Sequence, residues 1–143
     1  MSIVALDVGD RTIGVAASDE LGLTAQGLGT IWRKGDRHDF PALLALVGER
    51  EVDRWIVGWP LNMDGSEGPR AEKTRRFARR LQDHVSAPVL LWDERLSTFE
   101  AENVLREGGV RARERKAVVD MLAAQVILQS YLAAGAPEKG ERP

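Results

Sequence analysis

The sequence contains no cysteine, and this absence excludes several kinds of chemistry. Disulfide bonds, thiolate metal sites and a cysteine nucleophile are all ruled out. Only two histidines are present among the 143 residues. Any bound metal must therefore use carboxylates, carbonyl oxygens or one of these histidines.

Long apolar segments and a strong excess of one charge are absent as well. The first residues, MSIVALDVGD, lack the basic start and the apolar length of a signal peptide, and no stretch reaches the ~20 apolar residues of a membrane helix. We therefore expect a cytoplasmic protein without a membrane segment. The 20 basic and 22 acidic residues give a net charge of −2, so any binding of nucleic acid must depend on local clusters of positive charge.

The composition is that of a folded domain, with 43% hydrophobic and 29% charged residues. A chain of this length falls within the range of a single domain. We expect this domain to cover residues 1–134 and the tail at 135–143 to be disordered. The sequence does not fix the oligomeric state and is compatible with a homodimer.

Short apolar runs predict strands, and apolar residues at helical spacing predict helices. Five strands are expected, at residues 3–6, 13–17, 23–32, 55–58 and 88–92. Helices are expected from an N-cap at Asp39 to 48, at 69–85, from a capping box at Ser97 to 108, and at 118–134, where nearly every face is apolar. Three strands in succession, then alternating helices and strands, predict an α/β fold of the ribonuclease H-like type, with a mixed five-stranded sheet flanked by helices.

Three acidic residues stand in apolar surroundings, where a charge is costly. Asp7 ends the first predicted strand, Glu94 follows the fifth, and Asp120 lies inside the apolar final helix. Alanines at 117, 123 and 124 share the side of that helix that carries Asp120, and such small side chains would let it approach the sheet. Sites of α/β sheets usually form at strand ends. We therefore expect the three carboxylates to converge in one pocket.

Each of these acids also has a structural interpretation. Asp7 could simply start the turn at Gly9, because aspartate favours turns. Asp120 could be a buried residue whose carboxylate bonds to a backbone group, or its side chain could extend to solvent near the start of the helix.

The acidic pair at the end of the fifth strand offers two candidates for one role. Neighbouring residues of a strand face opposite sides of the sheet, so only one of Asp93 and Glu94 can join the pocket. We expect Glu94, with Asp93 as its substitute. The alternative is a solvated strand end with Arg95 as the counter-ion.

Three carboxylates from separate elements suit hard cations such as Mg²⁺ or Mn²⁺. In a two-metal site the ions lie roughly 3.5–4 Å apart and hold both the attacking and the leaving oxygen of a phosphodiester displacement. The acids therefore predict a metal-dependent nuclease, with Asp7, Glu94 and Asp120 as catalytic residues and metal ligands.

Four motifs occur in order along the chain. They are ALDVGDRTIG at 5–14 with Ser18-Asp19, VGWPLNMDGS at 57–66, DERLST at 93–98 and DMLAAQVILQ at 120–129. Together they resemble the YqgF/RuvX family, relatives of the RuvC Holliday junction resolvases, over nearly the whole chain. Trp59 departs from the family, where an aliphatic residue is commoner. The resemblance implies a ribonuclease H-like fold, a divalent metal, and acidic residues matching Asp7, Glu94 and Asp120.

Positive charge is concentrated between residues 70 and 80, which carry a local charge of +5. Phosphate groups are the expected partner of such a segment. The alternative is an ordinary solvated helix face. The residues expected to contact phosphates are Arg70, Lys73, Arg75, Arg76 and Arg79.

Further candidates lie in a polar loop and beside the acids. Asn62 and Ser66 could contact a sugar–phosphate backbone, or their loop could only lead into the next helix. Arg11 and Arg95 could neutralise charge on the scissile phosphate or hold the neighbouring carboxylates in place.

We expect an endonuclease whose partner is structured nucleic acid, either Holliday junction DNA or the 5′ end of pre-16S rRNA in ribosome biogenesis. One alternative is a non-catalytic nucleic-acid-binding protein with purely structural acids. The other starts from Asp7-Val8-Gly9, which is similar to the phosphate-binding hairpin of sugar kinases and actin-like ATPases. Those proteins bind nucleotide between two such domains, and 143 residues cannot supply both.

Overall fold

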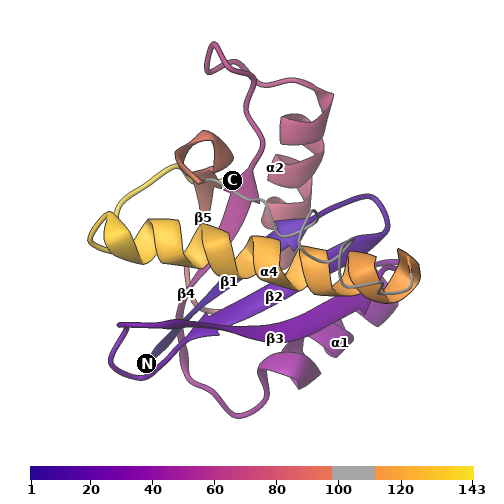
Figure 1. The fold of residues 1–143 in the computed structure, drawn as a ribbon, viewed down its shortest axis with the longest axis vertical. Helices are drawn as coiled ribbons and strands as arrows, with labels where there is room; N and C mark the ends of the chain where they lie inside the picture. Colours follow the sequence, from indigo (N-terminus) through magenta and orange to yellow (C-terminus); the bar gives the residue numbers. More distant parts are fainter. Residues whose placement is uncertain (98–111) are drawn as a thin grey trace.

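The computed structural model describes residues 1–97 and 112–143. Its centre is a five-stranded sheet in the order β3-β2-β1-β4-β5 (Figure 1). The first three strands are antiparallel neighbours, whereas β1, β4 and β5 run parallel. The strands are β1 (Ser2–Val8), β2 (Thr12–Ser18), β3 (Ala25–Trp32), β4 (Val52–Trp59) and β5 (Val89–Asp93). This arrangement confirms the predicted mixed sheet of a ribonuclease H-like fold.

Helices cover both faces of the sheet (Figure 1). Because side chains alternate along a strand, Val4 and Leu6 of β1 pack toward α1 (Asp36–Val47) and α2 (Pro69–Gln82). Ile3 and Ala5 face the other way, into a smaller core beneath α4 (Ala112–Ala133). The side chain after Ala5 on that face is Asp7, so the alternation directs its carboxylate toward α4.

Two helices begin earlier than predicted. The N-cap of α1 is Gly35, and the carboxylate of Asp39, which was expected to be the cap, accepts hydrogen bonds from the backbone N–H groups of Lys34 and Gly35 from within the first turn. Helix α4 begins at Ala112 rather than 118. The apolar pattern does not predict its first turns, since their residues are charged and carry no apolar stripe. The helix predicted at 97–108 lies outside the described residues, apart from Ser97.

The C-terminal segment at 135–143, for which disorder stays a prediction, contacts the sheet in this structure. The backbone N–H of Leu91 donates to the carbonyl oxygen of Glu141 over 2.8 Å. Arg54 donates to the carbonyl oxygen of Ala136 at 2.9 Å. β5 ends the sheet, and an edge strand offers unpaired backbone groups that a polar segment can satisfy. Within the described residues, no helix has the length and apolar character needed to cross a membrane.

Candidate active site

Asp7, Glu94 and Asp120 line one cavity of about 490 Å³. Asp7 lies near the end of β1, Glu94 opens the short 3₁₀ helix η1 (Glu94–Leu96) directly after β5, and Asp120 is on α4. The carboxyl ends of the parallel strands β1, β4 and β5 meet at this edge of the sheet. Arg70, at the start of α2, also lines the cavity. The structure thus brings all three predicted acids together, while their catalytic role stays a prediction.

Helix α4 comes close to the sheet because glycine stands opposite it. Gly14 pairs with Asp7 across β1 and β2, and a Cβ on Gly14 would lie 1.8 Å from the backbone carbonyl oxygen of Asp120. Thr30 adds a hydrogen bond from its hydroxyl to the carbonyl oxygen of Ala117. Of the three alanines expected to allow this approach, Ala124 is fully buried. The approach therefore depends on the sheet side as well as on the alanines.

The Asp120 carboxylate is held by two neighbours. The Thr12 hydroxyl donates a hydrogen bond of 2.5 Å to Oδ2, and Lys116, one turn earlier on α4, places its Nζ 3.2 Å from the same oxygen. Both contacts fall on Oδ2, which fixes the orientation of the group. Thr12 and Lys116 were not predicted as site residues, since Thr12 lies 108 positions from Asp120 in the sequence.

The structure separates the roles of the acidic pair after β5. Asp93 is bound by the Arg95 guanidinium at 2.7 Å, and this hydrogen bond holds the pKa of Asp93 below its usual value. Glu94 instead enters the cavity, where Gly58 leaves room for it: a Cβ on Gly58 would lie 2.6 Å from Glu94 Oε1. Burial raises the pKa of Glu94, and the positive charge of Arg70 offsets only part of that rise. The geometry therefore favours Glu94 over Asp93.

Asp7 is the most strongly perturbed of the acids. Burial, and next the negative charges of Glu94 and Asp120, raise its pKa to about 7. The positive charges of Arg70 and Lys116 act in the opposite direction and are outweighed. Buried carboxylates crowded in one cavity are typical of functional sites, because a folding core gains nothing from such repulsion.

The donor set around the cavity fits a hard divalent cation. Among residues 1–97 and 112–143, no three acidic or histidine side chains are grouped closely enough to hold a metal ion as they stand. The three carboxylates nevertheless line a common space, offer only oxygen donors, and repel one another in the absence of positive charge. A cation between them would remove this repulsion, so the residues present fit Mg²⁺ or Mn²⁺.

Of the residues expected to contact nucleic acid, Arg70 lines the cavity of the three acids, and the others form two groups. Arg11, Arg76 and Arg79 are exposed and have no ion pair within the described part of the chain, whereas Lys73 has only a 3.7 Å contact with Asp10. The four others bond to groups within the protein. Arg75 is bound by Glu67 and Glu141 and stacks on Trp59. Arg95 donates to Asp93 and to the carbonyl oxygen of Met63. The side chain of Asn62 donates to the hydroxyl of Ser66.

Two of the arginines make structural contacts within the protein, while their contact with nucleic acid stays a prediction. The side chain of Arg75 is 19% exposed and bonds to Glu141 and to the carbonyl oxygen of Arg142, so it helps to hold the C-terminal segment in place. Arg95 holds Asp93 and the loop at 62–66, which agrees with its structural alternative.

A family model described as RuvX, Holliday junction resolvase, matches residues 1–134. The chain belongs to the RuvX family. A protein of Halothermothrix orenii named "Putative pre-16S rRNA nuclease" is 55% identical to it over 92% of this chain and 94% of its own length. A Geobacillus kaustophilus protein of the same name is 53% identical over 92% of this chain and 97% of its own. These relatives and the family model are consistent with a nuclease.

Solved structures of resolvases share the fold. RuvC of Thermus thermophilus in complex with a Holliday junction substrate superimposes with a TM-score of 0.52 at 14% identity, covering 94% of this chain and 96% of that one. The fowlpox virus resolvase in complex with Holliday junction DNA gives a TM-score of 0.55 at 11% identity, covering 96% of this chain and all of that one (100%). At these identities the likeness establishes the ribonuclease H-like fold.

Proposed function

We propose that this protein is a metal-dependent endonuclease that hydrolyses phosphodiester bonds in structured nucleic acid. The observation that carries the proposal is the cavity where Asp7, Glu94 and Asp120 meet from three separate elements, with the pKa values of two of them raised. In this proposal the three carboxylates hold Mg²⁺ or Mn²⁺.

The chain's own residues prepare the site for a phosphate. Thr12 and Lys116 fix the carboxylate of Asp120, and Gly58 keeps space for Glu94. Arg70 lines the same cavity, and its positive charge, which acts on both Asp7 and Glu94, would attract a phosphodiester group. When bound, the metal supplies polarisation of the phosphate and a water of lowered pKa as the nucleophile.

We propose precursor 16S rRNA as the first candidate substrate, because relatives more than half identical carry that name. Processing of this RNA would place the activity in the cytoplasm. Holliday junction DNA is the second candidate, supported by the description of the matching family model.

A cleavage panel tests the proposal. Purified protein is incubated with precursor 16S rRNA, a four-way DNA junction and matched linear duplexes, with Mg²⁺, Mn²⁺ or EDTA. We expect metal-dependent cleavage of one structured substrate, abolished by Asp7→Asn, Glu94→Gln and Asp120→Asn. Asp93→Asn is the matched control, since it removes the neighbouring carboxylate outside the cavity, and should retain cleavage.

The panel also discriminates against the alternatives. Tight binding of RNA or junction DNA without any cleavage in either metal would favour a non-catalytic binding protein. Cleavage that survives Asp7→Asn would show that the acids are structural and that the proposed site is wrong.

A further inference from the structure

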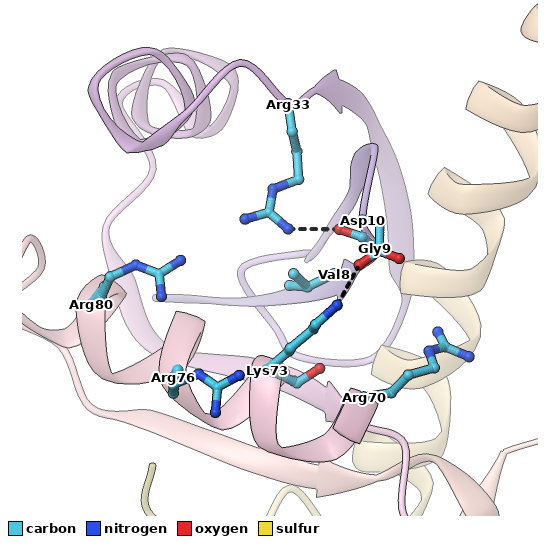
Figure 2. Close-up of a pocket in the computed structure, with 9 residues that line it drawn as sticks. Val8, Gly9, Asp10, Arg33, Arg70, Lys73, Arg76 and Arg80 are labelled. Atoms are coloured by element: carbon cyan, nitrogen blue, oxygen red, sulfur yellow. Dashed lines mark hydrogen bonds and ion pairs between the residues drawn. The ribbon is translucent and has the colours of Figure 1, made fainter. Parts of the chain in front are cut away.

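A second cavity, of about 150 Å³, lies on the opposite side of β1 from the acids. Its walls carry five cationic side chains, of which Arg33 and Lys73 reach the turn between β1 and β2 (Figure 2). They are Arg33, which follows β3, and Arg70, Lys73, Arg76 and Arg80 of α2. We call this feature the basic cavity.

The walls of the basic cavity are held in place by the protein. Arg33 donates to the carbonyl oxygen of Gly9 at 2.7 Å, and its Nε lies 3.7 Å from the buried carboxylate of Asp39. Arg80 pairs with Asp36 at 2.7 Å. Both guanidinium groups lie over the ring of Phe77, at 5.4 and 5.8 Å from its centroid. A ligand that binds here meets groups already ordered, which lowers the entropic cost of binding.

Positive charge in the basic cavity is only partly neutralised. Asp10 is the one acidic residue among those described that line it, and its contact with Lys73 is 3.7 Å between two largely exposed side chains. Such a pair is weak. Arg76 has no carboxylate partner in the described part of the chain. The basic cavity therefore favours an anion with several acceptor oxygens, and arginine matches phosphate in a two-pronged geometry.

The basic cavity and the cavity lined by Asp7, Glu94 and Asp120, which we call the acidic cavity, flank the same strand end. Asp7 and Val8 are neighbours whose side chains face opposite sides of the sheet, and they line the acidic and the basic cavity respectively. Arg70 lines both. A strand of nucleic acid that lies over the end of β1 would present one phosphate to the acids and another to the basic cavity.

We propose that the basic cavity is a second phosphate-binding site, which holds an internal phosphodiester group of the strand being cut. This inference rests on the proposed nuclease function, because it takes the same strand as the ligand of both cavities. It assigns Arg33 and Arg80, together with Lys73 and Arg76, to substrate positioning rather than to the reaction itself.

Binding measurements without metal test this proposal separately from catalysis. The affinity of Asp7→Asn protein for fluorescent junction DNA and precursor rRNA is measured in EDTA at several salt concentrations. Adding Arg76→Gln should weaken binding about tenfold. It should also reduce the slope of log affinity against log salt concentration by about 1. Arg50→Gln is the charge-matched control, since Arg50 bonds to the end of α1 beside the start of β4, away from both cavities.

A second comparison separates the basic cavity from the general charge of α2. Arg79 is on the same helix, is exposed and also lacks an ion pair among the described residues, but it does not line the basic cavity. Arg79→Gln should therefore weaken binding less than Arg76→Gln does. Equal losses from these two variants, with unchanged circular dichroism and melting temperature, would overturn the proposed site.

The source of the phosphate is tested with short oligonucleotides. Oligonucleotides with a 5′-phosphate and with a 5′-hydroxyl should bind equally, and both should lose affinity in Arg76→Gln. If Arg76→Gln lowered the affinity of only the 5′-phosphorylated oligonucleotide, the ligand would not be an internal phosphodiester. Displacement of the oligonucleotide by millimolar inorganic phosphate alone would contradict the proposal in the same way. If binding depended on Arg76 as expected but no metal supported cleavage, the proposed function would be overturned, and the basic cavity would remain only a site for a phosphate of a bound, uncut strand.

Discussion

Among the residues that the structure describes, Asp7 is the carboxylate whose ionisation the fold opposes most strongly. In the unfolded chain it ionises near the model value of 3.8, whereas in the folded, metal-free protein its pKa is about 7. Between these two values the unfolded state loses its proton while the folded state keeps it. The free energy of unfolding therefore falls as pH rises through this window, by about 4 kcal/mol in total.

Replacing Asp7 with Asn should remove this pH dependence. Asparagine has nearly the same shape and no charge, so we expect the metal-free variant to match the wild-type stability near pH 4 and to exceed it increasingly up to about pH 7. Urea unfolding in EDTA across this range measures the difference. If the difference in free energy of unfolding between the two proteins did not change with pH, Asp7 would not be a buried carboxylate with a raised pKa.

Asp93 provides a control with the opposite sign. The bond to Arg95 lowers the pKa of Asp93 in the folded protein, so the ionised carboxylate stabilises the fold at pH values above its pKa in the unfolded chain. This contribution is lost as the pH falls through the lower pKa of the folded protein. Asp93→Asn should therefore be less stable than wild type at pH 7, with a difference that closes on acidification.

Thr12 is a residue whose role depends on one hydrogen bond. It is 2% exposed and donates to Oδ2 of Asp120. Thr12→Val keeps the shape and removes the donor, so we expect metal affinity and cleavage rate to fall about tenfold, as for other groups that orient metal ligands. Thr12→Ser should retain both. Unchanged metal-dependent kinetics in Thr12→Val would indicate that Lys116 alone orients the carboxylate.

At the scale of elements, the contact between α4 and the sheet decides whether the site forms. Gly14→Ala would place a methyl group 1.8 Å from a backbone oxygen of α4, and backbone cannot yield as a flexible side chain can. We expect a loss of at least about 1–3 kcal/mol of stability, together with loss of cleavage as Asp120 moves away. Urea unfolding and the cleavage assay measure the two effects.

Gly9→Ala is the matched control in the same hairpin. A Cβ there would meet its nearest neighbour, the carbonyl oxygen of Thr12, at an ordinary 3.4 Å. A stability loss for Gly9→Ala as large as for Gly14→Ala would show that glycine matters here for the hairpin and not for the helix contact.

The elements themselves could largely be predicted from the sequence, because apolar runs and helical spacing report burial directly. The first turns of α4 could not, since their charged residues carry no apolar stripe. The start of α1 was misjudged because the carboxylate of Asp39 bonds backward to the turn before it. A glycine within an apolar strand indicates that another part of the chain packs closely against it. Gly14 and Gly58 both stand in such strands, so the sequence did hold a signal for these close contacts.

At the scale of the whole molecule, charge is divided between the two sides of the sheet. The net charge is only −2, yet the acids line one cavity beside α4 and the cations line another beside α2. The three acids could be predicted because a charge among apolar residues is conspicuous. Their supporting partners could not, because Thr12 meets Asp120, and Arg33 meets α2, only through the tertiary fold.

This division of charge predicts that a divalent cation stabilises the whole molecule. The metal-free acids repel one another, and a ligand that binds only the folded state raises stability by mass action. At one hundred times its dissociation constant, Mg²⁺ or Mn²⁺ should add about 2.7 kcal/mol. For a chain of this size that corresponds to a rise of roughly 5–10 °C in melting temperature.

The control must separate specific binding from screening of charge, because any salt weakens repulsion between partly exposed carboxylates. KCl at equal ionic strength should therefore produce a much smaller rise in melting temperature than the divalent cation does. Asp120→Asn removes one of the proposed ligands and should lose most of the divalent-specific rise while remaining folded. If KCl reproduced the rise, or if Asp120→Asn retained it in full, the three carboxylates would be repelling neighbours without a shared metal, and the proposed mechanism would have to be abandoned.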